Sequence, residues 1–227
     1  MLRVLHFTDP HLFAEVDGNL RGTVTFESLS AVLNDYRSDD WQADIAVVTG
    51  DLVQDDTAAA YQNFRLLLGD LGLPVYCVPG NHDVRSLMQA ALGEPPFHYC
   101  DTLEHGDWLI VGIDSCVSER AGGEISGAEF DRVDAAIAAS DASHVMLHLH
   151  HPPVALGSRW LDSVGLKNGD EALRRFAASG KVRLVIFGHV HQDFGTEIDG
   201  MRIVATPSTC SQFAPSVDDF AIDDRPP

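Results

Sequence analysis

Short apolar runs alternate along the first half of the chain with segments whose apolar residues have helical spacing. The apolar runs are rich in β-branched and aromatic residues, which predicts buried strands, and the spaced segments predict amphipathic helices. The expected strands are 2–8, 44–49 and 74–79, and the expected helices are 24–37, 57–68 and 84–92. Strands and helices that alternate in this way indicate an α/β fold.

The second half has shorter apolar runs and an Ala-rich helix that Ser126 should cap, with Glu129 at the third position after it. A turn at Asp199-Gly200 predicts a hairpin, and residues 154–168 are an expected loop. The expected strands are 97–100, 103–105, 108–114, 145–149, 182–187, 195–198 and 201–206, and the helices are 128–139 and 170–179. No linker interrupts residues 1–227, so we expect a single domain.

Polar side chains follow five of the predicted strands directly. Asp9 and His11 come after the first strand, Asp51 after the second, and Asn81 with His82 after the third. Two later strands end in the stretches His150-His151 and Gly188-His189-Val190-His191. Function in open α/β sheets sits at the carboxyl ends of the strands, so we expect these side chains to meet.

The net charge limits the binding partners that we expect, and the cysteine pattern indicates the cellular compartment. The formal net charge is -19. This argues against nucleic acid or an anionic membrane surface as a partner, because both bind to basic patches. The cysteines Cys77, Cys100, Cys116 and Cys210 show no CxxC spacing, as expected of free thiols in a reducing compartment. No apolar run approaches the ~18 residues of a membrane span, and no signal peptide is evident. We therefore expect a cytoplasmic protein.

The donor set at the strand ends is suited to two metal ions that share one carboxylate. Carboxylate, amide and imidazole ligands without thiolate favour Mn²⁺ or Fe, with Zn²⁺ as an alternative. Each motif alone is weak, because Asp-x-His and Gly-Asp strings occur by chance and a His at a strand end usually bonds to backbone. The ordered set, with each member at the tip of an apolar strand, predicts a dimetal site.

This set resembles the five motifs of the calcineurin-like metallophosphoesterases. The motifs are Asp9-x-His11, Gly50-Asp51, Gly80-Asn81-His82-Asp83, His150-x-Pro152 and Gly188-His189-x-His191. Residues 50–55, 160–162, 189–192 and 205–213 are also similar to the bacterial class III cyclic nucleotide phosphodiesterases. The resemblance implies an αββα sandwich of two mixed β-sheets flanked by helices, and hydrolysis of 3′,5′-cyclic AMP to 5′-AMP.

The resemblance also implies which residues would bind each of the two metal ions. One metal would be held by Asp9, His11, Asp51 and His191, and the other by Asp51, Asn81, His150 and His189. His150 is preferred to His151 because the family pattern is His-x-Pro, with His148 and His151 as neighbours. Two such cations would turn a bridging water into a hydroxide near neutral pH. His82 would protonate the leaving oxygen as general acid, with Asp55 or Asp83 as an orienting acid.

Four residues are candidate substrate contacts: Asn81, His82, Arg159 and Trp160. Arg159 and Trp160 lie just past His150 in sequence. Trp160 could stack on adenine or simply pack the loop; both interpretations stay open.

Two rival functions and one departure from the family pattern remain. Another ester of the same superfamily could be the substrate, such as a 2′,3′-cyclic nucleotide, a glycerophosphodiester or a UDP-sugar diphosphate. A non-catalytic metal-binding protein is the rival from another class. Related chains usually continue with further strands, so residues 218–224 should form a strand with an open edge, in a truncated or naturally short C-terminus.

Overall fold

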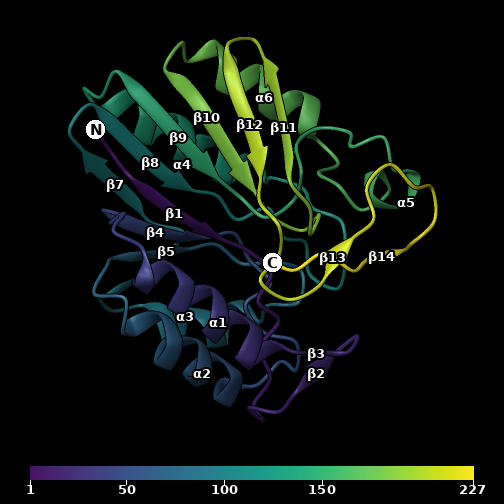
Figure 1. Cartoon of the computed structure of the whole chain (residues 1–227). Coiled ribbons are helices and arrows are strands. Elements are labelled where there is room, and N and C mark those ends of the chain that lie inside the picture. The colour runs from purple at the N-terminus through teal and green to yellow at the C-terminus, as the bar shows by residue number, and fades with distance from the viewer.

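The computed structural model describes residues 1–227 and has two β-sheets stacked face to face (Figure 1). The smaller sheet has the order β1-β4-β5-β6, with strands Val4–Phe7, Ile45–Val48, Val75–Cys77 and Phe97–Tyr99. All its neighbouring strands run parallel. It is therefore wholly parallel, whereas two mixed sheets were expected.

The larger sheet is mixed and has the order β11-β12-β10-β9-β8-β7. Its strands in that order are Phe194–Ile198, Met201–Ala205, Val182–Phe187, His144–His148, Trp108–Gly112 and Thr102–His105. The edge strands β7 and β11 pair antiparallel, and the inner strands pair parallel. As predicted, β11 and β12 form a hairpin, with Asp199 and Gly200 at positive φ in its turn.

Helices cover the outer face of each sheet, which completes the expected αββα sandwich (Figure 1). Over the smaller sheet lie α1 (Thr25–Ser38), α2 (Ala58–Gly69) and α3 (Arg85–Leu92). Over the larger sheet lie α4 (Gly127–Ala139) and α6 (Gly169–Ala178). Ser126 caps α4 as predicted, accepting a hydrogen bond from the Glu129 N–H at 3.1 Å. No helix is long and apolar enough to cross a bilayer.

Three apolar clusters fill the three spaces between the layers. One lies between α1–α3 and the smaller sheet, and another between α4, α6 and the larger sheet. The third lies between the two sheets and contains Val47 and Tyr76 from one side and Met146 and Ile186 from the other. Side chains alternate between the faces of a strand, so Leu5 and Phe7 of β1 face the helices and Val4 lies between the sheets.

The largest differences from the expected elements are near the C-terminus and in two loops. Residues 218–224 contribute only the short strand β14 (Ile222–Asp223), which pairs antiparallel with β13 (Gln212–Phe213). The expected strand at 218–224 is therefore reduced to two residues, and β13 pairs with one side of it. The segment between β1 and α1, for which no element was predicted, contains the two-stranded ribbon β2 (Asn19–Leu20) and β3 (Thr23–Val24). The expected loop 154–168 contains α5 (Arg159–Asp162).

Candidate metal centre

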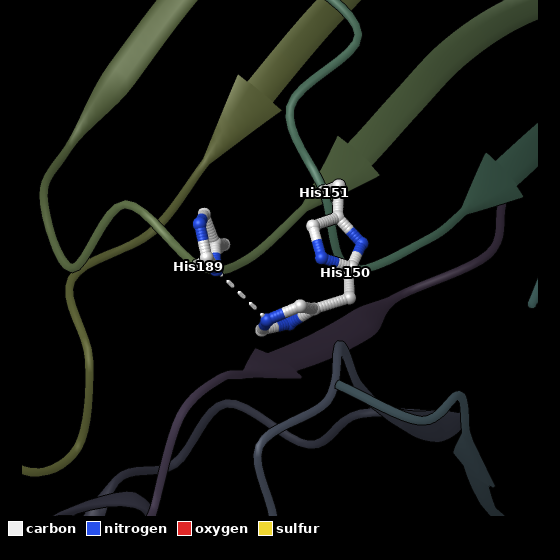
Figure 2. Close-up of side chains that lie close together, drawn as sticks. All are labelled: His150, His151 and His189. Atoms are coloured by element: carbon white, nitrogen blue, oxygen red, sulfur yellow. Dashed lines mark hydrogen bonds between the residues drawn. The ribbon is translucent and has the colours of Figure 1, made fainter. Parts of the chain in front are cut away.

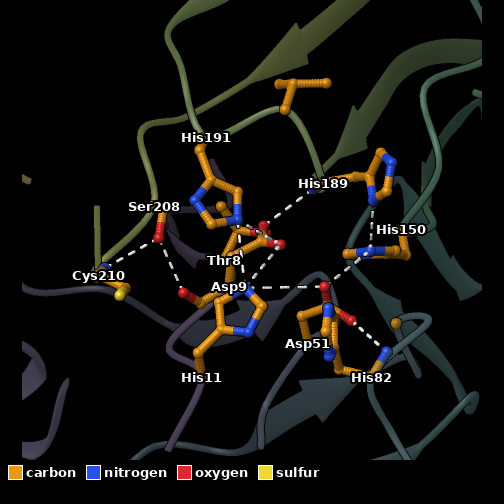
Figure 3. Close-up of polar contacts among 12 residues, drawn as sticks. Thr8, Asp9, His11, Asp51, His82, His150, His189, His191, Ser208 and Cys210 are labelled. Carbon is orange, nitrogen blue, oxygen red and sulfur yellow. Dashed lines mark hydrogen bonds and ion pairs between the residues drawn. The ribbon is translucent and has the colours of Figure 1, made fainter. Parts of the chain in front are cut away.

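The polar residues that follow β1, β4, β5, β9 and β10 gather at one end of the sandwich. They come from both sheets, so the site lies where the carboxyl ends of the two sets of strands meet (Figure 3). Of the seven expected metal ligands, Asp9, His11, Asp51, His150, His189 and His191 are buried; Asn81 retains some exposure.

Several of these residues adopt a backbone conformation that residues other than glycine rarely adopt. The φ angles are 52° at Asp9, 47° at His11, 50° at Asp51, 71° at His189 and 47° at His191. Such left-handed conformations cost ~1–3 kcal/mol each and concentrate at functional sites. The chain therefore turns sharply just after each strand, and that turn aims the side chains at one another.

The glycines of the motifs allow these turns to approach one another. A Cβ on Gly80 would lie 2.1 Å from Asp51 Oδ1, and one on Gly188 would lie 2.0 Å from Thr8 Oγ1. No side chain fits at such distances, so these positions require glycine. The motif spacing thus reflects packing as well as chemistry.

Asp9, His11 and His191 form the first half of the site. Asp9 Oδ1 lies 3.2 Å from His191 Nε2 and 3.8 Å from His11 Nε2. The Nε2 atoms of His11 and His191 are 3.2 Å apart. His191 Nδ1 lies 2.6 Å from the carbonyl oxygen of Ser211, which places the ring proton on Nδ1 and leaves the Nε2 lone pair facing the site.

Asn81, His150 and His189 form the second half. His150 Nε2 lies 3.2 Å from Asn81 Oδ1. The same nitrogen lies 3.1 Å from His189 Nδ1 (Figures 2 and 3). His150 Nδ1 donates to the Thr49 carbonyl at 2.7 Å, so its Nε2 also faces the site and would bind a cation once its proton is lost.

Asp51 lies between the two halves. Its Oδ2 atom is 3.7 Å from His11 Nε2 and 3.5 Å from His150 Nε2. Its other oxygen, Oδ1, accepts the backbone N–H of His82 at 2.8 Å, which fixes the carboxylate orientation. This is the position that a carboxylate shared by two metal ions would occupy.

The donor set fits two divalent cations. Asp9 Oδ1 is buried without a hydrogen-bond donor, and acceptor atoms of Asp51, His11 and His150 face it and one another across a few ångströms. Buried acceptors that converge without a donor are costly unless a cation or proton lies among them. These residues therefore fit two cations that would share the Asp51 carboxylate.

Charge interactions within the cluster shift its acid–base behaviour. Burial alone would raise the pKa of Asp9, but His191 beside it holds the pKa of that carboxyl well below its usual range. Burial works against a charge on His150, yet the nearby Asp51 and Asp9 raise its pKa to about 9. Burial lowers the pKa of His11 to about 4 and that of His189 to about 3. Burial would likewise raise the pKa of Asp51, but His150 beside it holds that pKa well below its usual range. The two carboxylates thus stay ionised, whereas a cation at His150 would have to displace its proton.

His151 lies next to this cluster but its ring faces other partners. His150, His151 and His189 bring ligand atoms close together (Figure 2), yet His151 Nδ1 is 2.9 Å from Ser115 Oγ and Nε2 is 3.1 Å from the Ala121 carbonyl. Both ring nitrogens are therefore occupied. The structure places His150, not His151, between Asn81 and Asp51.

His82 lies at the edge of the first half, but its expected orienting acids lie elsewhere. Its ring is 5.1 Å from that of His11, centroid to centroid, and its Nδ1 is 3.3 Å from the side-chain nitrogen of Gln54. Asp55 accepts from the Ala14 N–H and the Thr57 hydroxyl. Asp83 accepts from Leu52, Gly80 and Tyr61. Neither carboxylate hydrogen-bonds to His82, because both are occupied in holding backbone loops; Gln54 takes that position.

Arg159 and Trp160, expected near the nucleotide, contact the C-terminal segment. Arg159 is exposed and pairs with Asp218 at 2.8 Å. Trp160 packs edge-on against Phe213 and Phe220, with ring centroids 5.1 and 5.2 Å away. Phe213 in turn stacks on His191 at 4.1 Å. The packing interpretation of Trp160 therefore accounts for its contacts in this structure.

Sequence reasoning missed the residues that hold the ligands in place. Gln54 contacts His82, and Ser211 and Phe213 contact His191. Thr8 hydrogen-bonds to Asp9, and Thr49 hydrogen-bonds to Thr8. The two threonines had a detectable signal, since each immediately follows a β-strand and precedes the first polar motif after that strand. Gln54, Ser211 and Phe213 lie in the stretches 50–55 and 205–213 that carry the family resemblance, but no role was predicted for them.

Comparison with known proteins agrees with this geometry. The family model described as calcineurin-like phosphoesterase matches residues 2–193. The chain belongs to the calcineurin-like phosphoesterase family. Among curated relatives, the 3′,5′-cyclic adenosine monophosphate phosphodiesterase CpdA of Escherichia coli is 36% identical, over 98% of this chain and 81% of that protein. A 3′,5′-cyclic-nucleotide phosphodiesterase of Nostoc is 30% identical, over 100% of this chain and 85% of that protein.

Solved structures show that the fold of this family is shared more widely. A dimetal phosphatase from Danio rerio superimposes with a TM-score of 0.71 at 14% identity, covering 97% of this chain and 91% of that one. GAP50, described as the anchor in the inner membrane complex of Plasmodium, gives a TM-score of 0.66 at 13% identity, with coverages of 97% and 75%. At such identities these likenesses show the fold alone, and function has to be argued from the site.

Proposed function

We propose that this calcineurin-like phosphoesterase is a dimetal phosphodiesterase that hydrolyses 3′,5′-cyclic AMP to 5′-AMP. The observation that carries the dimetal part is the position of Asp51 Oδ2, 3.7 Å from His11 Nε2 and 3.5 Å from His150 Nε2. The relatives named as cyclic AMP phosphodiesterases, which match 98% of the chain, support the substrate.

Asp9, His11, Asp51 and His191 would hold one ion, and Asp51, Asn81, His150 and His189 the other. Bound there, two divalent cations supply an acidified water and offset the charge of the phosphate oxygens. Oxygen and imidazole donors without thiolate favour Mn²⁺ or Fe over a structural zinc site, with Zn²⁺ as the alternative.

The remaining chemistry belongs to His82 and Asn81. The side-chain amide of Gln54 lies 3.3 Å from Nδ1 of His82. In the imidazolium form both ring nitrogens of His82 carry a proton, and loss of the proton on Nε2 leaves a neutral ring. We assign to that Nε2–H the protonation of the departing 3′-oxygen, a role that general acids fill with ~10²–10⁴-fold effect. The Asn81 amide, beside His150, orients the phosphate from the other half of the site.

The proposed substrate and location agree with the charge and cysteine pattern. A net charge of -19 disfavours nucleic acid as the substrate, whereas a small cyclic nucleotide would meet a site whose local field the bound cations dominate. Free Cys77, Cys100, Cys116 and Cys210 are consistent with a reducing cytoplasm.

The test is hydrolysis by metal-stripped protein reloaded with Mn²⁺. We expect turnover of 3′,5′-cyclic AMP and of a generic aryl phosphodiester, and loss of both in Asn81→Ala. A panel with a 2′,3′-cyclic nucleotide, a glycerophosphodiester and a UDP-sugar diphosphate separates the substrates. Cleavage of another ester in preference to cyclic AMP would retain the enzyme class and reject the substrate. Cleavage of none would favour a non-catalytic metal-binding protein.

A further inference from the structure

A chain of short hydrogen bonds runs from Asp9 away from the metal centre into the space between the sheets. Thr8 Oγ1 lies 2.5 Å from Asp9 Oδ2, Thr49 Oγ1 lies 2.8 Å from Thr8 Oγ1, and His6 Nε2 lies 2.9 Å from Thr49 Oγ1. His6 and Thr8 belong to the β1 segment and Thr49 directly follows β4, so two neighbouring parallel strands supply every link.

The carboxylate at one end fixes the direction of every bond in this chain. An ionised Asp9 can only accept, so the Thr8 hydroxyl must donate its single proton to it. Thr8 Oγ1 then accepts a hydrogen bond from the Thr49 hydroxyl. Because Thr49 has donated its only hydroxyl proton to Thr8, its oxygen must accept a hydrogen bond from His6 Nε2. His6 therefore carries a proton on Nε2. The reverse direction would require a protonated Asp9, and His191 beside Asp9 opposes that.

The chain determines which oxygen of Asp9 faces the metal centre. Oδ2 receives two donors, the Thr8 hydroxyl and the His189 N–H at 2.9 Å. Oδ1 has none and is the atom nearest His191 and His11. A carboxylate held in this way cannot rotate freely, so one oxygen stays available to a cation.

A second imidazole between the sheets lacks this connection. His148 on β9 is fully buried, and neither of its ring nitrogens has a hydrogen-bond partner. It resembles His6 in location and in chemical type but has no link to Asp9. His148 therefore provides a matched control within the same layer.

We propose that His6, Thr49 and Thr8 form a hydrogen-bonded relay that orients the Asp9 carboxylate, which makes His6 a positioning residue for metal binding. The inference rests on the assignment of Asp9 as a metal ligand in the proposed function. Partners one shell outside the ligands typically change metal affinity ~10–100-fold when they are removed. The relay extends that outer shell to a residue on the middle of β1.

The first experiment measures Mn²⁺ affinity by calorimetry on variants that break or keep the relay. Thr49→Val and His6→Leu remove a link, and we expect Mn²⁺ affinity to fall ~10–100-fold. Thr49→Ser keeps the hydroxyl, and His6→Gln keeps an N–H donor near the position of Nε2, so both should bind close to the wild-type affinity. His148→Leu should also bind normally.

Two outcomes would reject the positioning role. Wild-type affinity in folded Thr49→Val would show that the relay does not orient Asp9. An equal loss in His6→Leu and His148→Leu would show a general packing effect. Circular dichroism and thermal unfolding of each metal-free variant establish that a weaker affinity does not reflect an unfolded chain.

A second experiment reads the relay without any metal. Nitrogen-15 NMR of metal-free protein distinguishes the two imidazole tautomers, and we expect His6 to be protonated on Nε2. Protonation on Nδ1 alone would reject the relay whatever the enzyme binds. If Asp9→Asn binds Mn²⁺ as well as the wild type does, the ligand assignment fails instead, and the tautomer of His6 still reports on the hydrogen-bond chain.

Discussion

His82 differs from the neighbouring imidazoles in what its ring contacts. The rings of His150 and His191 donate from Nδ1 to backbone carbonyls and turn Nε2 to the cluster. His82 instead faces the side-chain nitrogen of Gln54 through Nδ1 and stands edge-on to His11. It is therefore placed beside the ligands without being required among them.

The first prediction separates the roles of His82 and the ligands. His82→Ala should retain both metal ions and lose ~10²–10⁴-fold in turnover, because the leaving oxygen no longer receives a proton. Mn²⁺ stoichiometry by calorimetry and turnover at saturating metal measure the two effects. Asp51→Asn is the contrasting variant, since it should lose metal as well. Equal metal loss in His82→Ala would remove the acid role.

The site residues were predictable where motif and strand end coincide. Asp9, His11, Asp51, Asn81, His150, His189 and His191 meet as expected, because parallel strands end on the same side of a sheet. The positions of Asp55 and Asp83 were not predictable. Both lie near His82 in sequence or in a motif, yet backbone N–H groups in turns compete for carboxylates, and here those groups win.

At the scale of elements, α2 connects two of the loops that carry site residues. Tyr61 on α2 donates to Asp83 Oδ1 at 3.0 Å and accepts the Val84 N–H at 2.9 Å. Asp83 also accepts from Leu52 N–H, next to Asp51, and from Gly80 N–H, next to Asn81. One helix side chain and one carboxylate thus hold together the turns after β4 and β5.

Removing the Tyr61 hydroxyl tests this connection. Tyr61 is fully buried, and Tyr61→Phe leaves the partly buried Val84 N–H without its acceptor and removes one of the donors to Asp83. We therefore expect a loss of ~1–3 kcal/mol in the free energy of unfolding. Tyr36→Phe on α1 is a control that also removes a tyrosine hydroxyl, one that accepts only the Ala43 N–H, at 3.1 Å. Urea unfolding of the metal-free proteins measures both. Equal effects would show that the Tyr61 hydroxyl has no special structural role.

Most elements were predictable because their apolar patterns are long and bounded by turn residues. The two-residue strands β2, β3, β13 and β14 and the four-residue α5 were not. They are too short to show a period, and contacts with distant residues determine them. For example, β14 exists because Gln212 and Phe213 offer it an edge, a partner that the local sequence 218–224 does not reveal.

At the scale of the whole molecule, the sandwich has an apolar space between its sheets that also contains imidazole. His148 lies there beside Gly112, where a Cβ would come within 3.0 Å of its ring. Its nitrogens have no partner, and burial lowers its pKa to about 3. Stacking two sheets thus creates an environment that disfavours a charged histidine, a property that no single strand has.

This environment predicts how acid affects stability. An unfolded His148 takes up a proton as the pH falls below ~6.5, whereas the folded one does not until about pH 3. Between these values the unfolded state binds the additional proton, so this residue reduces the free energy of unfolding by ~1.4 kcal/mol for each unit of falling pH. His148→Leu removes that contribution.

We therefore expect the stability of His148→Leu relative to the wild type to increase steadily from pH 7 to pH 4. Urea unfolding of both metal-free proteins at each pH measures the difference, and titrating groups distant from His148 cancel because they are common to both chains. Parallel stability curves would show that the buried ring finds a partner for its proton. A difference that grows by ~1.4 kcal/mol per unit would show that the space between the sheets stays closed to water as the protein is acidified.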